Sequence, residues 1–419
     1  MMVKRRTFPL LIASALAVMV YVIFTLPRSQ PGNHQHLYPH HISDQSITPV
    51  NDTKHFMVGA YKEHRLEGSS VRIISIFRRD SVQPLYCVFY CGTHWANGMK
   101  AEVQMHSDHF GICHLLFGFS PALTHLNQHP NQRKGLGDSL IGLLTFDAEL
   151  AQNQTFLRIQ NLVKREEEEF QSNFTVCWSN LFGNNNNVLQ VTQTLEMYKL
   201  LGVQHVVVYN TSCGPDLERL LQSYTQEGFV EVVPWPINQY MNPSSGWQPS
   251  EHGGDIHYYG QLTTLNDCVY RNMYQSRYVL LNDIDEIIAP YQHQTLPQMM
   301  DVLQRQNPKA EVFLIENHYR IYHPSKMIVR PRTVEQTFCV SDPRAVEQTS
   351  VHSVLRNFGQ TVKVPPNVCH IIHVRVPLRG GLTKKELHED KRVWDYERQL
   401  VPNVDKALEK AGLLRNIFS

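Results

Sequence analysis

The sequence predicts an α/β domain with an open mixed sheet flanked by helices, preceded by a small β-rich region and an N-terminal apolar helix. Three observations predict this order. From residue 175 onward, short apolar runs alternate with amphipathic segments, which is typical of parallel sheets with helical crossovers. Residues 71–118 carry short runs rich in β-branched and aromatic residues. Residues 8–26 are uncharged and almost wholly apolar.

The apolar run at residues 8–26 is long enough to cross a membrane as a helix. It would span about 28 Å at 1.5 Å per residue, close to the hydrocarbon thickness of a bilayer. Basic residues at positions 4–6 place the tail, residues 1–7, in the cytosol. A cleaved signal peptide is the alternative, but residues 25–28 are a poor match to a small-residue cleavage site. We therefore expect an uncleaved type II signal anchor.

Composition changes along the chain predict the domain boundaries. Residues 27–70 are rich in His, Pro, Ser, Gln and Asn without sustained periodicity, and we interpret them as a stem. The histidines in this stretch can bind metal in principle, but a solvated low-complexity linker is the simpler interpretation. We expect a β-rich accessory region at residues 71–172 and the α/β domain at residues 173–419.

Cysteines and glycosylation sequons agree with a lumenal location. An even number of cysteines in an oxidising compartment predicts disulfides, although eight cysteines allow 105 pairings. Zinc is the alternative, but the C-x-x-C pairs of a zinc module are missing. Four N-glycosylation sequons begin at Asn51, Asn153, Asn173 and Asn210. The eight cysteines, all after the apolar run, are Cys87, Cys91, Cys113, Cys177, Cys213, Cys268, Cys339 and Cys369.

The overall charge excludes some partners. The formal net charge is +1, so there is no electrostatic argument for binding nucleic acid or a polybasic membrane contact. A hydrophobic content of 42% supports packed cores. The membrane is therefore expected to be contacted only through the N-terminal helix.

The α/β pattern can be followed element by element. Apolar residues at 188, 191, 195 and 198 recur every three to four positions, which indicates a helix that Gly202 ends. Buried ligand sites of open α/β sheets lie at the carboxyl ends of the strands. The expected order is strand 175–178, helix 188–201, strand 205–209, helix 215–228, strand 229–233, helix 261–274 and strand 278–281.

A pair of aspartates directly follows the last of these strands. Asp283 and Asp285 are two residues apart, so extended backbone directs both carboxylates to one side. Hard cations such as Mg²⁺ and Mn²⁺ prefer oxygen ligands and bind through one or two carboxylates plus substrate phosphates. A D-x-D alone is also common at acidic strand ends facing water. Its position at the carboxyl edge of an α/β sheet favours a metal and nucleotide site.

Several segments together resemble glycosyltransferase family 92. The resemblance covers roughly residues 177–375. Its segments are LFGN at 181–184, LEMY at 195–198, GFVEVVPW at 228–235, SGW at 245–247, HYYGQ at 257–261, NDC at 266–268, DIDE at 283–286, KMIVRP at 326–331, VHSV at 351–354 and HVR at 373–375. One departure is Val374, where we expect an aromatic residue.

The resemblance implies a GT-A fold, a UDP-galactose donor and Mn²⁺, with Mg²⁺ as the alternative cation. It also implies an inverting transfer to a terminal galactose or fucose of a glycan, which forms a β1,4 linkage. Asp285 is then the direct metal ligand, while Asp283 faces the nucleotide sugar and shares the cation. His373 is the candidate third ligand, and His370, three residues away, is the alternative.

Other site residues are hypotheses of the same kind. An inverting transfer needs a base to deprotonate the acceptor hydroxyl. Glu316 is the first candidate because it ends an apolar strand, and Glu286 and Asp267 are the others. The candidate donor contacts are Arg271, Asn184 and Trp247, with Asp283. Further candidates are Arg375 for the pyrophosphate and Trp235, Tyr258 and Tyr259 for stacking on sugars.

Together these features predict a metal-dependent galactosyltransferase anchored in the Golgi membrane with its catalytic domain in the lumen. A catalytically inactive glycan-binding protein on a transferase scaffold is the alternative, but a pure binding module needs no metal clamp. A retaining transferase or a glycosidase is the third possibility, but a glycosidase uses two carboxylates flanking the scissile bond and does not need adjacent aspartates at a strand end. The sequence leaves the oligomeric state and the acceptor open.

Overall fold

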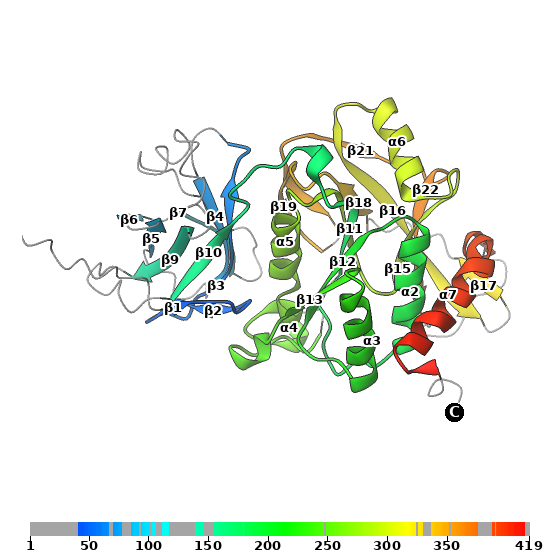
Figure 1. Ribbon diagram of the computed structural model, residues 1–419, viewed down its shortest axis with the longest axis horizontal. Helices are drawn as coiled ribbons and strands as arrows, with labels where there is room; N and C mark the ends of the chain where they lie inside the picture. The colour runs from blue at the N-terminus through cyan, green and yellow to red at the C-terminus, as the bar shows by residue number, and fades with distance from the viewer. Residues whose placement is uncertain are drawn as a thin grey trace, which may run out of the picture.

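The computed structural model describes two units that lie side by side, an N-terminal β unit and an α/β domain (Figure 1). The described residues are 41–66, 70–77, 85–91, 94–100, 102–105, 111–116, 139–145, 155–178, 180–246, 249–323, 326–329, 337–351, 353–375, 388–389 and 391–414. The predicted cytosolic tail and membrane span therefore lie outside the described residues. Of the helices within the described ranges, none is long and apolar enough to cross a membrane.

The β unit is one sheet with the path β6-β5-β9-β10-β3-β4-β8-β7, to which β1 and β2 add through β10 and β3. Most neighbours are antiparallel, as β3 with β4 and β4 with β8. Its strands are β1 (His41–Ile42), β2 (Thr48–Pro49), β3 (Phe56–Glu63), β4 (Ser70–Phe77), β5 (Leu85–Cys91), β6 (His94–Lys100), β7 (Glu102–Met105), β8 (Gly111–Leu116), β9 (Ser139–Thr145) and β10 (Thr155–Gln160).

The predicted stem needs a correction. Residues 41–63 contain β1, β2 and β3, so the second half of the expected stem belongs to the β unit. The sequence did not indicate a strand at β3 because this strand is buried along almost its whole length. Its apolar and polar residues therefore do not alternate. Residues 27–40 of the expected stem lie outside the described residues.

The α/β domain contains an 11-stranded mixed sheet. Strands β13, β12, β11 and β14 lie in that order and are parallel, while β18 continues the sheet antiparallel to β14. Its strands are β11 (Ser172–Trp178), β12 (His205–Asn210), β13 (Val230–Pro234), β14 (Ser276–Asn282), β15 (Glu286–Pro290), β16 (Ala310–His323), β17 (Lys326–Val329), β18 (Thr337–Ser341), β21 (Gln360–Lys363), β22 (Cys369–Arg375) and β23 (His388–Glu389). A separate hairpin pairs β19 (Val346–Thr349) with β20 (Val354–Asn357).

Helices cover both faces of this sheet. One hydrophobic core lies between the sheet and four helices, namely α2 (Val188–Leu200), α3 (Pro215–Gln226), α6 (Leu296–Gln306) and α7 (Glu397–Lys410). Helix α5 (Gln261–Arg271) packs on the other face. The predicted alternation of strands and helices from residue 175 to 281 is confirmed, with boundaries that differ by up to three residues.

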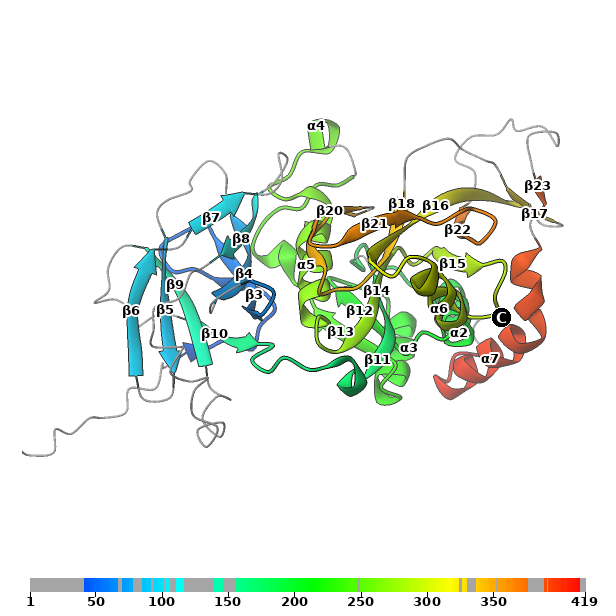
Figure 2. The ribbon, with the colours of Figure 1, turned by 90° about the horizontal axis from the view of Figure 1, so that it is seen from above.

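The second core joins the two units. It contains Leu265 and Val269 of α5 together with Tyr61 of β3 and Ile74 and Ile76 of β4. In both views α5 lies between the β unit and the α/β sheet (Figure 1, Figure 2). The β unit is therefore packed against the α/β domain rather than tethered to it.

One of the expected disulfides is present. Cys177 of β11 is bonded to Cys268 of α5, which fixes this helix to the central strand of the sheet. Among the cysteines whose side chains are described, Cys87, Cys213, Cys339 and Cys369 are free thiols.

Candidate active site

The D-x-D forms a tight turn at the carboxyl end of β14. The Asp283 N–H donates to Oε2 of Glu286 over 3.1 Å, and the Glu286 N–H donates to the Asp283 carbonyl over 3.1 Å. These two bonds close the turn, so Glu286 orients the motif that precedes it. Asp283 and Asp285 remain partly exposed, whereas Glu286 is fully buried.

Two side chains of helix α2 donate hydrogen bonds to the backbone of this turn. Thr194 donates its hydroxyl to the carbonyl of Ile284 over 2.9 Å, and Tyr198 donates to the carbonyl of Glu286 over 2.8 Å. Burial raises the pKa of Tyr198, and the nearby Glu286 and Asp283 carboxylates raise it further. The phenol therefore stays protonated and remains a donor. Sequence reasoning missed both residues, although Tyr198 ends the LEMY segment.

Helix α5 approaches the same turn from the other face of the sheet. Its first residue, Gln261, lies with Nε2 3.5 Å from Oδ1 of Asp283. Oε1 of Gln261 is buried and has no hydrogen-bond partner among the described residues. A buried, unpaired amide oxygen beside a carboxylate would be satisfied by coordinating a cation or by accepting a hydrogen bond from a substrate hydroxyl.

A strained turn precedes α5. Tyr258, Tyr259 and Gly260 have φ of 42°, 59° and 72°, so three consecutive residues adopt left-handed conformations. Non-glycine residues rarely adopt this region, and such strain persists only where surrounding contacts impose it. Here the Tyr259 carbonyl accepts from Asn180 at 2.6 Å and from Trp235 at 2.8 Å.

Aromatic rings gather beside this turn. Phe182 stacks on Tyr259 with 4.1 Å between ring centroids and meets Tyr258 edge-on at 5.1 Å. Trp235 is fully buried and its indole holds the Tyr259 carbonyl, so it is a core residue rather than the predicted sugar platform. Trp247 lies outside the described residues. Phe182, which sequence reasoning did not single out, belongs to the LFGN segment.

Asn184 lies where the sequence predicted it, in the loop after β11 at the same edge of the sheet. It is exposed, has a positive φ of 54°, and its N–H meets the Ser212 hydroxyl at 3.3 Å. The next three asparagines have structural roles: Asn185 accepts from the Asn187 N–H, and Asn186 and Asn187 accept from the first turns of α3 and α2. Of this run, Asn184 is therefore the one free to contact a nucleotide.

Glu316 lies level with the aspartates in the sheet. Val279 of β14 and Val312 of β16 both pair with Ser341 of β18, and four residues further along each strand come Asp283 and Glu316. Two strand spacings separate these positions, about 10 Å. Phe313 and Ile315 face the α2 core, so alternation turns Glu316 to the α5 side.

The Glu316 carboxylate is half-buried and forms a 2.7 Å ion pair with the exposed Lys363. Two other candidates for the base are placed differently. Glu286 is fully buried in the turn that it closes. Asp267 is 1% exposed and accepts bonds from two tyrosine hydroxyls, so neither carboxylate can reach a substrate in this arrangement.

The β22 register separates the two candidate histidines. His373 pairs with Glu286, next to the D-x-D, whereas His370 pairs with Ala289 further along β15. The His370 ring stacks on Tyr291 with centroids 4.1 Å apart, and Nδ1 lies 3.1 Å from the Pro366 carbonyl. Strand register therefore favours His373. Its side chain and that of Arg375 lie outside the described ones.

The prediction for Arg271 is corrected by its position. It ends α5, ten residues or about 15 Å of helix away from Gln261. Its guanidinium pairs with Asp267 at 3.1 Å and Glu231 at 3.3 Å. It lines a polar cleft of about 490 Å³ beside Ser172 and His205, the first residues of β11 and β12. That is the amino edge of the sheet, opposite to the D-x-D.

The donor set at the D-x-D fits a hard divalent cation. Asp283 and Asp285 offer carboxylate oxygens, the ligand type that Mg²⁺ and Mn²⁺ prefer, and Gln261 lies beside them with Nε2 toward Asp283. Among the described side chains, no group of three His, Cys, Asp or Glu residues forms a metal cluster. His373, the predicted third ligand, pairs with Glu286 in the strand register.

Comparison with known families settles what kind of chain this is. The model of glycosyltransferase family 92 matches residues 172–410, more than half of the chain. This chain belongs to glycosyltransferase family 92. The matched region starts at the first residue of β11 and ends at the last residue of α7, so it covers the α/β domain.

Two relatives from Caenorhabditis elegans match at low identity. Glycosyltransferase family 92 protein F13G3.3 is 24% identical over 258 residues, 56% of this chain and 50% of that protein. Beta-1,4-galactosyltransferase galt-1 is 22% identical over 239 residues, 52% of this chain and 52% of that protein. The chain thus spans about half the length of the curated relatives that it matches.

A solved structure also matches, more remotely. The mannosyltransferase PcManGT from Pyrobaculum calidifontis, in complex with GDP-Man and Mn²⁺, is 10% identical with a TM-score of 0.28. The match covers 60% of this chain and 76% of that one. A similarity of this size carries no argument about the fold, donor or metal of this family 92 chain. The open mixed sheet with helices on both faces is observed directly, and its assignment to the GT-A class remains a prediction.

Proposed function

We propose that this family 92 chain is an inverting, metal-dependent galactosyltransferase that uses UDP-galactose and forms a β1,4 linkage to a terminal galactose or fucose. The observation that carries the proposal is the D-x-D turn at the carboxyl edge of the sheet, with two partly exposed carboxylates held by α2 and Glu286. The relative named as a beta-1,4-galactosyltransferase supports the choice of donor and linkage.

In this proposal Asp283, Asp285 and His373 hold the cation, with Gln261 beside them. A divalent cation bound there supplies a Lewis acid that neutralises the charge developing on the diphosphate. The protein's own contribution is preorganisation, because Glu286, Thr194 and Tyr198 fix the turn before any substrate arrives. Phe182, Tyr258 and the exposed Asn184 then offer contacts for the donor at the same edge.

Glu316 is the proposed base. It accepts the proton of the acceptor hydroxyl while the hydroxyl oxygen attacks the anomeric carbon from the face opposite to the diphosphate. The bond between that carbon and the diphosphate oxygen breaks, and UDP leaves. Strand register places Glu316 about 10 Å from the aspartates, at the same edge of the sheet. Lys363 pairs with this carboxylate in the absence of substrate and must release it for the hydroxyl to approach.

The test is transfer by the full-length chain from a panel of UDP-galactose, UDP-glucose, UDP-N-acetylglucosamine and GDP-mannose, with Mn²⁺ or with EDTA. We expect galactose transfer that depends on Mn²⁺, with a product whose anomeric proton coupling is that of a β-galactoside. An α-linked product would overturn the inverting mechanism. Glycan binding without transfer from any donor would favour an inactive binding protein instead.

We also propose that residues 8–26 anchor the chain in the Golgi membrane with the α/β domain in the lumen. The basic residues at positions 4–6 and the apolar run support this topology. In intact microsomes the C-terminus should be protected from protease and become sensitive after detergent. A freely secreted product whose mature N-terminus lies near Arg28 would refute the anchor.

A further inference from the structure

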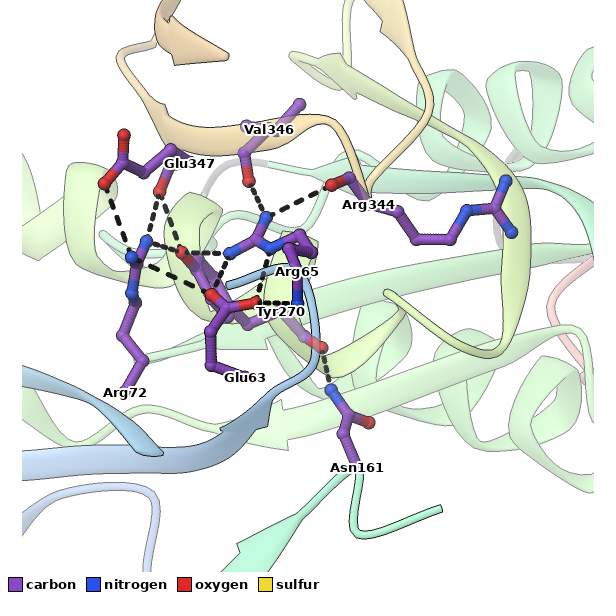
Figure 3. Close-up of polar contacts among 8 residues, drawn as sticks. All are labelled: Glu63, Arg65, Arg72, Asn161, Tyr270, Arg344, Val346 and Glu347. Carbon is purple, nitrogen blue, oxygen red and sulfur yellow. Dashed lines mark hydrogen bonds and ion pairs between the residues drawn. The ribbon is translucent and has the colours of Figure 1, made fainter. Parts of the chain in front are cut away.

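The β unit contacts α5 through a buried cluster of charges, which we call the Tyr270 cluster. It consists of Glu63, Arg65 and Arg72 from the β unit with Tyr270 of α5 and Glu347 of β19 (Figure 3). Arg65 donates to the Tyr270 hydroxyl over 2.9 Å, and Arg72 donates to the same oxygen. That hydroxyl in turn donates to the Glu347 carbonyl over 2.9 Å.

Burial makes the geometry of this cluster specific. Arg72 is fully buried and Glu63 is 2% exposed, and removing ions from water is costly unless their hydrogen bonds are satisfied. Burial acts to raise the pKa of Glu63, but the hydrogen bond and charge of Arg65 and the charge of Arg72 outweigh it and lower that pKa. Glu63 therefore stays ionised, and its partners keep their low-energy arrangement only with α5 in one position.

A second contact holds the same helix one turn earlier. Tyr61 of β3 donates to Oδ1 of the buried Asp267 over 2.5 Å, and Tyr209 of β12 donates to Oδ2 over 2.6 Å. The β3 backbone approaches so closely that a Cβ added at Gly59 would lie 2.4 Å from Oδ1 of Asp267. Helix α5 is thus held by the β unit at two successive turns, together with β12 at Asp267 and with β19 at Tyr270.

The other end of α5 lies in the candidate active site. Gln261, two to three turns before Tyr270, is the residue whose amide meets Asp283. Between these ends α5 is bonded to β11 through the Cys177–Cys268 disulfide and to β19 through paired Asn266–Thr349 hydrogen bonds. Because these contacts hold α5 along its length, the helix is placed as one unit, and the contacts with the β unit contribute to the position of Gln261.

We propose that Arg72 and Tyr270 are positioning residues for the metal site, so that the β unit sets the place of Gln261 against Asp283 through α5. This inference rests on the proposed function, because it concerns the cation held at the D-x-D. It assigns the β unit a part in the catalytic centre, although the family 92 match starts only at residue 172.

The first experiment measures Mn²⁺ binding directly, by the loss of the free-ion electron paramagnetic resonance signal when the full-length chain is titrated in the presence of UDP. The variant Arg72→Met removes the guanidinium but keeps an unbranched chain, and Glu63 retains Arg65. We expect the dissociation constant for Mn²⁺ to rise between about twofold and thirtyfold, the range of long-range coupling energies. Loss of folded protein alone would lower the number of sites and leave this constant unchanged.

The matched control is Arg219→Met. Arg219 is half-exposed on α3, where it pairs with Asp216 at 3.4 Å on the opposite face of the sheet. Its replacement should change the dissociation constant less than twofold. Tyr270→Phe is a second variant that removes only the shared hydroxyl, and it should shift the constant in the same direction as Arg72→Met.

A double-mutant cycle tests the route. If Arg72 acts through Gln261, the combined effect of Arg72→Met and Gln261→Ala on Mn²⁺ binding should be less than the product of the single effects. Wild-type constants in both Arg72→Met and Tyr270→Phe would overturn this inference and leave the proposed function intact. A wild-type chain that binds no Mn²⁺ would overturn the metal clamp itself, and the inference with it.

Discussion

At the residue scale, Asp283 and Asp285 have a different structural role from Glu286. The two aspartates are partly exposed at the strand end, whereas Glu286 is buried and bonded to the Asp283 amide. The sequence prediction assumed extended backbone that directs both carboxylates to one side, whereas residues 283–286 form a turn closed by Glu286. The sequence also did not show that Glu286 closes this turn rather than acting as a base, because that role depends on its burial and on which N–H lies near its carboxylate.

Asp285→Asn should abolish metal-dependent transfer while the chain remains folded. The amide keeps the size of the side chain but loses the charge that binds the cation, and we expect a loss of more than about a hundredfold, since supporting residues alone contribute 10- to 100-fold. Activity at saturating Mn²⁺ and circular dichroism measure the two parts. Asp301→Asn, on the exposed face of α6, is the control. Near-normal activity of Asp285→Asn would refute the ligand assignment.

Glu316→Gln should slow turnover far more than it weakens donor binding. A general base contributes about 10²- to 10⁴-fold, and its effect is expressed in the transition state, so kcat should fall with little change in the dissociation constant for UDP-galactose. Stopped-time assays and donor titration separate the two. Glu311→Gln, a half-buried glutamate at the start of the same strand, should leave kcat near wild type. If Glu316→Gln retains normal kcat, another group is the base.

At the element scale, local sequence signals predicted most of the α/β domain but not the left-handed turn before α5. Helices α2 and α3 begin at the predicted residues, Val188 and Pro215, and Gly202 follows α2 as predicted. The left-handed run at Tyr258 and Tyr259 could not be predicted, because non-glycine residues disfavour it and the bonds from Asn180 and Trp235 that hold it come from distant segments. The position of Arg271 was mispredicted for a related reason, since α5 carries it to the far edge of the sheet.

Gly260→Ala tests this turn. The position has a φ of +72°, and an added Cβ would lie 3.1 Å from Ile256 and 3.3 Å from Trp235. The left-handed conformation costs a non-glycine residue about 1–2 kcal/mol, and the contacts add to that. Gly412→Ala has a similar φ of +70° with nothing within 4 Å of the added atom, so it isolates the backbone cost. Chemical denaturation should show a larger loss for Gly260→Ala, and equal losses would mean that the crowding is relieved.

At the scale of the whole molecule, the sequence predicted two regions but not how they join. The stem was placed too far along the chain because β3 does not alternate, and the β unit was treated as an accessory. Its contribution to the α5 core depends on Tyr61, Ile74 and Ile76, which lie about 200 residues from their partners. Local sequence patterns do not predict contacts between residues that lie so far apart in the chain.

Deletion should reveal this dependence. Removing residues 1–160 takes away the β unit and with it five buried apolar residues of the shared core, Ile47, Val58, Tyr61, Ile74 and Ile76. Each buried side chain of this kind is worth about 1.5–3 kcal/mol, so the total is comparable to the roughly 5–15 kcal/mol that stabilises a whole domain. Asp267 and Tyr270 would also lose the partners that Tyr61, Arg65 and Arg72 provide.

We therefore expect a chain starting at residue 161 to be insoluble or to lack cooperative unfolding, whereas a chain starting at residue 41 should stay folded. Size-exclusion chromatography and thermal denaturation compare the two, and a cooperatively folded 161–419 chain would show that the α/β domain does not need the β unit.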